Sequence, residues 1–337
     1  MFELKLPKVI NEINYFKRNE NGKGCVLYSY TRDKGIMTIC KNDFADIEKD
    51  FSVSQNTLEI IKNIDVVNLE ITENKILFEG KGGNNFTANL LACEGLPTFN
   101  DTFENEIEIE MNTLIKAKTF SNSDNVSFAV LNGVKINNFG DVFATDRITA
   151  FRKINDSVQS REGEEKYIVL PKEFIDILKS EIGTQGKVKV KFNKTKCLVE
   201  KEDMSFVSGL YDGKYPELNM IFAPSYSSVC SFSIKVNGLK AKAKIFDKIK
   251  TNENKLVFCE FKNDKLTIEG ESLFETELEM TSKNDNDYDF SISYDNFKKM
   301  LVVAENIVAV DYYGEKRPIR FGLEDKSEIV LLPIVRI

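Results

Sequence analysis

The sequence contains no histidine among its 337 residues, and this absence excludes several classes of enzyme. Histidine is the commonest general base and metal ligand, so Ser-His-Asp triads, Cys-His pairs and histidine metal centres are excluded. Only carboxylates, lysine, tyrosine or cysteine remain for catalysis. The glycine-rich stretch "EGKGGNNF" at 79–86 lacks the following helix that a phosphate-binding loop needs. We therefore expect no catalytic residue, no metal and no cofactor.

The chain also has few prolines and no long apolar run. Seven prolines, 42% apolar residues and 29% charged residues are typical of a folded globular protein. The N-terminal stretch "MFELKLPKVINEINYF" mixes charges into its apolar positions, so we expect neither a signal peptide nor a membrane span. The expected location is the cytoplasm. A length of 337 residues predicts two or three domains.

No Cys-x-x-Cys pair occurs, which argues against a zinc site and against a compact disulfide framework. Buried, reduced thiols are the favoured interpretation. The six cysteines lie far apart, at Cys25, Cys40, Cys93, Cys197, Cys230 and Cys259.

Six segments have apolar residues at helical spacing, and the stretches between them alternate at strand spacing. The predicted helices are residues 6–18, 55–64, 111–121, 171–182, 236–249 and 294–305. They recur at nearly regular intervals, which indicates an internal repeat. One helix on a few antiparallel strands cannot bury its apolar stripe alone, so such half-domains pair. The pattern predicts an α+β protein of three similar domains, at residues 1–104, 105–225 and 226–337.

Several strings resemble the bacterial or phage DNA polymerase III beta subunit, the DNA sliding clamp. The best match is "SFVSGLYDGKYPELNMIFAP" at 205–224, where an Asp-Gly turn, aromatics and prolines crowd together at a crossover between domains. The other matching strings occur along the chain in the same order as in the family. They are "VLNGVKINN" (130–138), "DVFATDRITAFRK" (141–153), "YIVLPKEFIDILKSEI" (167–182), "NKLVFCEFKNDKLTIEGES" (254–272) and "EIVLLPIVRI" (328–337). The first domain matches more weakly and looks shortened between residues 19 and 50.

The resemblance implies a DNA clamp fold, in which three domains of two half-repeats each form a head-to-tail homodimeric ring. Helices would line the hole and sheets would form the outer wall, with duplex DNA encircled without sequence specificity. Implied partners are a DNA polymerase, a clamp loader and other replication and repair proteins. The implied role is a processivity factor in DNA replication and not an enzyme. For the dimer contact, the resemblance suggests Phe86 against Ile249.

Lysines on the predicted helices are the candidates for DNA contact. The net charge of −7 argues mildly against nucleic acid, although a local cluster can reverse that effect. In segment 236–249, three lysines recur at i, i+4 beside the apolar face; such a stripe either faces phosphate or is a solvated face. With the family resemblance we favour DNA lining. The predicted set is Lys8, Lys23, Lys62, Lys116, Lys118, Lys179, Lys240, Lys244, Lys248, Lys298 and Lys299.

The resemblance also implies an apolar groove between the second and third domains that takes short extended peptides from partner proteins. The alternative is that these positions are ordinary core and edge residues, above all Leu131 and Val229. Position by position, the groove residues are Leu131, Thr145, Arg147, Ile148, Pro224, Val229, Leu332, Pro333, Ile334, Val335 and Arg336.

At this groove the sequence departs from the family pattern Ala-Thr-Asp-x-His-Arg-Leu, because it reads "ATDRITAF". Ungapped matching places Ile148 and Thr149 at the His-Arg positions. A deletion of one residue would instead make Arg147 and Ile148 the Arg-Leu pair, and we prefer this alignment because it restores a basic-apolar pair. The preference for partner peptides is expected to differ accordingly.

Two other functions compete with this interpretation. A carboxylate- or tyrosine-based hydrolase would need a pocket with paired acids, and the sequence offers none. A monomeric clamp-fold adaptor, which binds peptides without closing a ring, would fit a shortened first domain.

Overall fold

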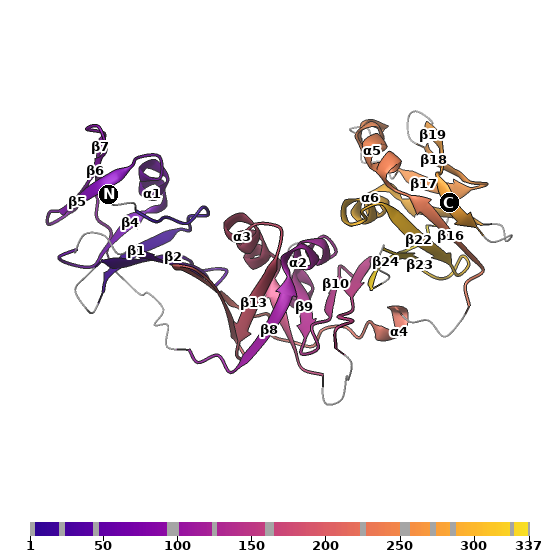
Figure 1. The fold of residues 1–337 in the computed structure, drawn as a ribbon, viewed down its shortest axis with the longest axis horizontal. Coiled ribbons are helices and arrows are strands. Elements are labelled where there is room, and N and C mark those ends of the chain that lie inside the picture. The colour runs from indigo at the N-terminus through magenta and orange to yellow at the C-terminus, as the bar shows by residue number, and fades with distance from the viewer. Residues whose placement is uncertain are drawn as a thin grey trace. The chain divides into compact units, whose positions relative to one another are not determined.

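The computed structural model describes residues 4–19, 24–42, 47–92, 101–122, 127–158, 165–222, 227–249, 257–269, 274–283, 288–323 and 327–335. The chain divides into two compact units. Unit 1 comprises Met1–Met111 and Glu173–Tyr211, and unit 2 comprises Asn112–Lys172 and Asp212–Ile337. Both units are built from antiparallel sheets with a few short helices (Figure 1).

Unit 1 contains an eight-stranded sheet with the strand order β4-β1-β2-β3-β15-β14-β13-β8. Its centre is the antiparallel pairing of β3 with β15, which joins segments that are far apart in the sequence. The strands are β1 (Ile13–Arg18), β2 (Cys25–Thr31), β3 (Ile36–Asn42), β4 (Phe51–Ser54), β8 (Asn105–Glu110), β13 (Lys187–Phe192), β14 (Lys196–Lys201) and β15 (Met204–Gly209).

Unit 2 contains a nine-stranded sheet with the order β12-β9-β10-β11-β24-β23-β22-β16-β20. The C-terminal strand β24 pairs with β11, so that Phe151 lies opposite Val330. The strands are β9 (Gly133–Asn137), β10 (Val142–Thr145), β11 (Ala150–Lys153), β12 (Tyr167–Pro171), β16 (Cys230–Lys235), β20 (Met280–Lys283), β22 (Ile307–Tyr312), β23 (Ile319–Gly322) and β24 (Glu328–Leu332).

Each unit has one smaller sheet in addition. In unit 1 it has the order β5-β6-β7, with β5 (Val66–Ile71), β6 (Lys75–Gly80) and β7 (Asn85–Asn89). In unit 2 it has the order β19-β18-β17-β21, with β17 (Phe258–Lys262), β18 (Lys265–Glu269), β19 (Phe274–Glu277) and β21 (Asp289–Ser293). Tight turns join β5 to β6, β6 to β7 and β17 to β18, as the alternating sequence pattern predicts.

Five of the six predicted helices are confirmed: α1 (Gln55–Ile61), α2 (Met111–Lys118), α3 (Lys172–Ile182), α5 (Asn237–Ile249) and α6 (Tyr294–Val303). Ser293 caps the N-terminus of α6, because its side chain accepts a hydrogen bond from the backbone of Asn296. The structure adds α4 (Asn219–Phe222) and a short 3₁₀ helix at Ala129–Asn132. In unit 2, α5 and α6 contact each other, and α6 packs on β17, β21 and β24 (Figure 1).

The helix predicted at residues 6–18 is wrong. Residues 13–18 form β1, which pairs with β2 on one side and with β4 on the other. The buried side chains Asn14 and Phe16 are two residues apart, which is strand periodicity. Before the strand, Asn11 hydrogen-bonds the side chain and the backbone of Ser29. Pairing on both sides satisfies the backbone groups of β1, so tertiary structure overrides the helical spacing of the apolar residues.

The five cysteines in the described part of the chain are free and buried, as the sequence predicts. Burial raises the pKa of Cys25 and of Cys40 to about 12, so neither is a reactive thiolate near neutral pH. The predicted domain boundaries near residues 104 and 225 stay a prediction. Each long sheet contains strands from both sides of one predicted boundary. Each compact unit therefore holds one long sheet and not one predicted domain.

Candidate functional site

The candidate site is built around the groove hairpin, which we define as β10, the loop of residues 146–149 and β11. The sequence "ATDRITAF" forms this hairpin, with Thr145 opposite Ala150 at its end. Within the loop, the Asp146 carboxylate accepts hydrogen bonds from the backbone N–H groups of Ile148 at 2.9 Å and Thr149 at 2.6 Å. This Asx-type arrangement is how an aspartate fixes a short turn.

The loop holds Arg147 in the left-handed region, at φ 77°. A non-glycine residue in this region carries a conformational cost that surrounding contacts must offset. Here the backbone N–H of Arg147 donates to the Thr145 hydroxyl at 3.0 Å, and that hydroxyl donates to the carbonyl of Thr149 at 2.7 Å. The Arg147 guanidinium lies 4.3 Å from the ring centroid of Phe128. The conformation of the loop therefore depends on side chains.

The end of β10 next to the loop is anchored by the stretch "DGKY" at 212–215. The backbone N–H of Thr145 donates to the hydroxyl of Tyr215 at 3.2 Å. Tyr215 is buried, and burial raises its pKa, so it stays a neutral phenol. Its own backbone N–H donates to the hydroxyl of Tyr167, which in turn donates to the carbonyl of Gly213. The Asp-Gly turn and its aromatic neighbour thus support the groove hairpin.

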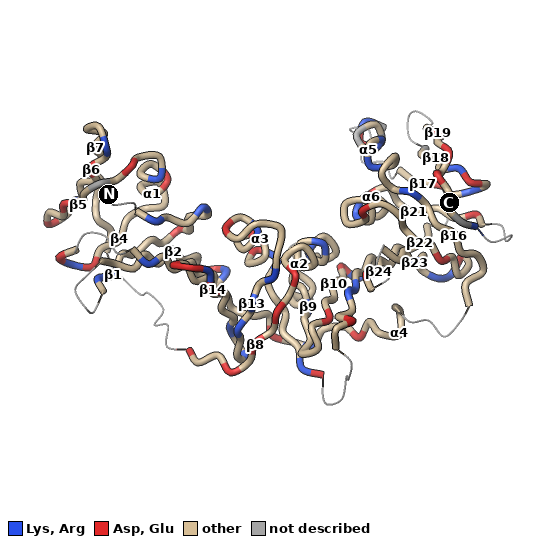
Figure 2. Tube along the Cα trace, in the orientation of Figure 1, with Lys and Arg blue, Asp and Glu red and all other residues tan. Residues whose placement is uncertain are grey.

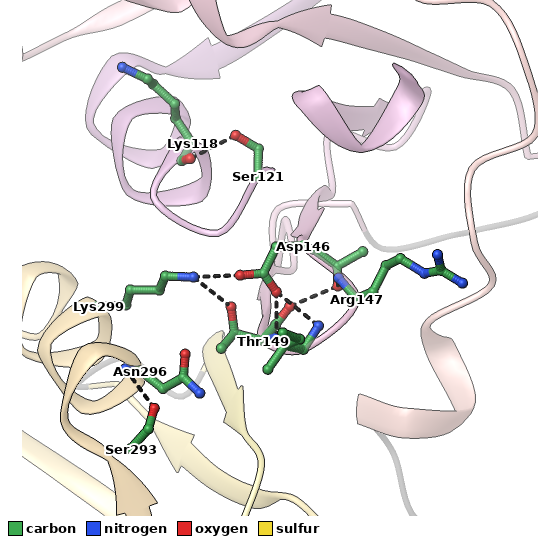
Figure 3. Close-up of polar contacts among 10 residues, drawn as sticks. Lys118, Ser121, Asp146, Arg147, Thr149, Ser293, Asn296 and Lys299 are labelled. Atoms are coloured by element: carbon green, nitrogen blue, oxygen red, sulfur yellow. Dashed lines mark hydrogen bonds and ion pairs between the residues drawn. The ribbon is translucent and has the colours of Figure 1, made fainter. Parts of the chain in front are cut away.

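Lys299 reaches the loop from α6, which lies far along the chain. Its ammonium forms an ion pair with Asp146 and lies 3.4 Å from the Thr149 hydroxyl (Figure 3). The side chains of Lys299 and Asp146 are 28% and 13% exposed, so the pair is partly shielded from solvent. One oxygen of the Asp146 carboxylate serves the loop backbone and the other serves Lys299.

Apolar side chains are exposed on the groove hairpin, at Phe128 next to Arg147 and, elsewhere in unit 2, at Val229. Ile148 at its tip is 64% exposed, Val229 is 48% exposed and Phe128 is 47% exposed. Exposed apolar groups next to polar ones are the composition of a surface that binds partner proteins.

The other predicted groove residues divide between core and surface. Leu131 and Leu332 are buried, which fits the alternative that Leu131 is a core residue. Pro333, Ile334 and Val335 are half-buried, and Val335 forms an isolated bridge to Ser291. The backbone of Val229 donates to the carbonyl of Tyr312 at 2.8 Å. The predicted residues Pro224 and Arg336 lie outside the described part of the chain.

Four of the predicted DNA-lining lysines contact carboxylates. Lys116 bonds Glu328 at 2.9 Å and Glu305 at 3.1 Å. Burial lowers the pKa of Lys116, but the hydrogen bonds and charges of these two glutamates outweigh burial, and the net direction is upward. Lys298 bonds Asp247 of α5 at 2.6 Å, and Lys299 pairs with Asp146. The fourth is Lys62, which lies 3.9 Å from Glu59 and bonds the carbonyl of Lys8.

The remaining lysines differ in exposure. Lys179 and Lys248 are exposed and Lys240 is half-buried, and none of these three ammonium groups has a partner among the residues that the structure describes. Lys8 is exposed and bonds the carbonyl of Ser180 at 2.9 Å, whereas Lys118 is half-buried. Blue segments mark lysines on α5 and α6 in Figure 2. Lys23 and the side chain of Lys244 lie outside the described residues.

The two predicted dimer residues lie in different units. Phe86 is on β7, an edge strand of the three-stranded sheet, and it packs half-buried against the core of unit 1. Ile249 is the last residue of α5, and its side chain is outside the described part.

Sequence reasoning missed four residues that shape the site: Phe128, Asp146, Tyr167 and Tyr215. For Asp146, the signal was present, because an aspartate at the start of a hairpin loop predicts an Asx turn. No sequence signal identified the partner on α6, since 153 positions separate it from Asp146.

Residues 107–217 match the family model of the DNA polymerase III beta subunit, central domain. The comparison with curated proteins finds no match.

Solved structures of DNA sliding clamps match along nearly the whole chain. The beta subunit of the Streptococcus pyogenes DNA polymerase has a TM-score of 0.79 at 16% identity and covers 100% of this chain and 95% of its own. The sliding clamp of Bacillus subtilis has a TM-score of 0.78 at 18% identity, with 96% and 91% covered. The sliding clamp of Pseudomonas aeruginosa bound to griselimycin has a TM-score of 0.78 at 16% identity, with 99% and 94% covered.

The protein therefore has the DNA clamp fold, and the predicted α+β class is confirmed. Within that fold it resembles the DNA polymerase III beta subunit, as the sequence predicts. In the described residues, no helix is long and apolar enough to cross a membrane.

Proposed function

We propose that this protein is a DNA sliding clamp: a processivity factor that encircles duplex DNA and tethers a DNA polymerase to its template. The observation that carries the proposal is the agreement in fold with the Streptococcus pyogenes beta subunit over 100% of the chain. A ring that holds an enzyme on its template makes rebinding effectively intramolecular, which raises processivity without any new catalytic group. In this role the protein is not an enzyme, and it works on DNA in the cytoplasm.

Lysines on the helices would hold the duplex. Lys179, Lys240 and Lys248 support this part of the proposal, because their ammonium groups have no partner among the described residues. Contacts of lysine with phosphate carry no base information, so binding would be independent of sequence and sensitive to salt. Weak contacts of this kind let a ring slide.

The groove hairpin would bind the partner proteins. Arg147 and Ile148 present a cation and an exposed apolar side chain next to each other on a loop that Asp146 fixes. A short extended peptide with apolar side chains fits such a surface. Through it the polymerase, the clamp loader and repair proteins would bind in turn, with Val229 and residues 332–335 as further walls of the groove.

Ring closure would come from a head-to-tail homodimer. β7 is an edge strand with Phe86 on it, and an unpaired edge is a natural site for pairing with another chain. The C-terminal end of α5 at Ile249 is the proposed contact on the partner. A heterologous contact of this type closes when the rotation between subunits completes a circle.

The test is negative-stain electron microscopy together with sedimentation velocity of the purified protein. We expect closed rings with a mass of twice 38.4 kDa. Phe86→Asp should open the ring and leave a folded monomer. The matched control is Ile60→Asp, which places the same charge at an apolar residue on α1 that is 43% exposed, and should leave the dimer intact.

Compact monomers of the wild-type protein at the same concentration would overturn ring closure and favour the monomeric adaptor. Measurements of duplex binding by fluorescence anisotropy at several salt concentrations test the DNA side. Lys248→Ala should lower the slope of log affinity against log salt by about one.

A further inference from the structure

Lys299 belongs to two surfaces of unit 2. On α6, Phe297, Met300 and Leu301 are buried against the sheet, whereas Lys298 and Lys299 lie on the opposite, partly exposed side. This side of the helix is the proposed DNA-lining side. At the same time, Lys299 is ion-paired with the carboxylate that fixes the groove hairpin (Figure 3).

Among the described residues of α6, Lys299 is the one that contacts the Asp146 carboxylate. Asp146 uses one oxygen to hold the N–H groups of Ile148 and Thr149, and gives the other to Lys299. A carboxylate that loses its cation is a weaker anchor for a loop whose next residue, Arg147, sits at φ 77°. The tip that carries Ile148 thus depends on where the ammonium of Lys299 points.

We infer that duplex DNA and the groove hairpin compete for Lys299, so that DNA in the ring loosens the groove wall. The inference rests on the proposed function, because the competing ligand is a backbone phosphate. A phosphate that attracts the ammonium withdraws it from Asp146, and the turn is then held only by the hydrogen bonds that the Asp146 and Thr145 side chains accept from its backbone. Binding free energies are reciprocal, so a peptide that needs the fixed hairpin keeps Lys299 on Asp146 and weakens DNA binding by the same factor.

The size of the effect follows from the exposure of the pair. Partly exposed ion pairs change an equilibrium by about two- to five-fold. This factor is small enough for DNA and a groove peptide to be bound at the same time. It is large enough to change the relative occupancy of the groove by competing partner proteins.

Lys298 is a matched control for Lys299. It is the neighbouring residue on α6 and carries the same charge, but it bonds Asp247 of α5 and not the hairpin. Lys298→Met and Lys299→Met each remove one cation from the same side of the helix, so both should weaken DNA binding. Only Lys299→Met should abolish the coupling.

The experiment is hydrogen exchange of the Ile148 and Thr149 amides in the full-length protein, with and without a short linear duplex at low salt. Both amides donate to Asp146, so their exchange rates report on the turn. We expect the duplex to speed exchange about two- to five-fold in the wild type and in Lys298→Met. In Lys299→Met exchange should be fast already and unchanged by DNA. Asp146→Asn keeps the acceptor oxygen but loses the ion pair, and should behave like Lys299→Met.

Fluorescence anisotropy on the same samples measures whether the duplex is bound. Bound duplex with unchanged exchange at both amides of the wild type would overturn the coupling and leave the clamp proposal standing. Equal responses to DNA in Lys298→Met and Lys299→Met would also overturn it. If no duplex binds at any salt concentration, both the proposed function and the coupling are wrong.

Discussion

The two long sheets of this protein follow the same plan, but only one of them carries the candidate site. In unit 1, β4-β1-β2-β3 meet β15-β14-β13-β8 at the β3–β15 pair. In unit 2, β12-β9-β10-β11 meet β24-β23-β22-β16 at the β11–β24 pair. The turn between β2 and β3 therefore corresponds to the loop of the groove hairpin, and α3 corresponds to α6. The architecture alone thus does not make a binding site.

The two corresponding turns are held in different ways. In unit 1, the residue with a positive φ is Gly35, at 59°, and its carbonyl accepts the backbone N–H of Gly209. Glycine adopts this conformation without side-chain help. In unit 2, the corresponding loop places Arg147 at a positive φ, and Asp146 with Lys299 holds it. Strain offset by polar side chains is typical of functional loops, and here it coincides with the candidate site.

The helices beside these turns have opposite charges. In unit 1, α3 presents Glu173 and Asp176 to a cavity of about 400 Å³ that Lys34 of the turn also lines. In unit 2, the matching helix presents Lys299 to Asp146 in the loop of the groove hairpin. Beside these two turns, the two helices therefore present charges of opposite sign.

The largest expected effect tests whether the two junctions are equally important for stability. Phe151 on β11 and Phe206 on β15 are both fully buried at a junction strand. Replacing either by alanine leaves a large cavity and should lower the free energy of unfolding by about 3–5 kcal/mol. Urea unfolding gives the size of the loss, and hydrogen exchange shows which unit opens. If both variants lose hydrogen-exchange protection in the same unit, the two junctions do not correspond.

The next effect separates a buried ion pair from an exposed one. Lys116 is 12% exposed beside Glu328 of β24, whereas Lys5 pairs with Asp203 next to β15 with both side chains about half exposed. Lys116→Met should cost about 3 kcal/mol, because it leaves a shielded carboxylate without its main cation. Lys5→Met should produce no measurable change in urea unfolding, because solvent already screens that pair. Equal losses in the two variants would contradict the difference in burial.

A smaller effect compares the two turns themselves. Asp146→Ala removes the acceptor for two backbone N–H groups and the partner of Lys299, and should cost about 2 kcal/mol. Gly35→Ala should cost about 1 kcal/mol, since a Cβ there meets nothing closer than 3.9 Å and only the positive φ opposes it. Thermal and urea unfolding of both variants provide the measurement. A larger loss for the glycine variant would mean that side chains do not hold the groove loop.

The sequence predicts the local structure of the groove hairpin better than its environment. Alternating apolar residues predict the strands, and Ser293 predicts the start of α6, because these signals are local. The position of Lys299 over Asp146 depends on the β11–β24 pair, which brings together residues far apart in the sequence. The same limit applies to the lysines. Periodicity identifies the lysines that lie on helices. It does not predict that Lys116 and Lys298 form ion pairs.

The error at residues 6–18 has the same origin. The apolar residues of this segment are spaced as in a helix. Residues 13–18 nevertheless pair with β2 on one side and β4 on the other, and the buried Asn14 and Phe16 are two residues apart, as in a strand. A buried asparagine breaks the hydrophobic alternation that would have identified the strand. In β1, the buried polar residue therefore conceals the strand from the sequence pattern.

The smallest effect concerns pH and sets the same two ion pairs apart again. The hydrogen bond from Lys5 lowers the pKa of Asp203 below its ordinary value of 3.8, although the carboxyl is about half exposed. A carboxyl whose pKa is lower in the folded state contributes stability above its unfolded value and loses it as pH falls. The Lys116 pKa is raised above 10.5, so that contribution is present below this value and is lost only as pH rises beyond it. Asp203→Asn should unfold slightly more easily than the wild type above about pH 4, and this difference should disappear as the pH falls further. Lys116→Met should differ from the wild type by a constant amount between about pH 6 and 9. A difference for Lys116→Met that varies across this neutral range would show that another group titrates with the pair.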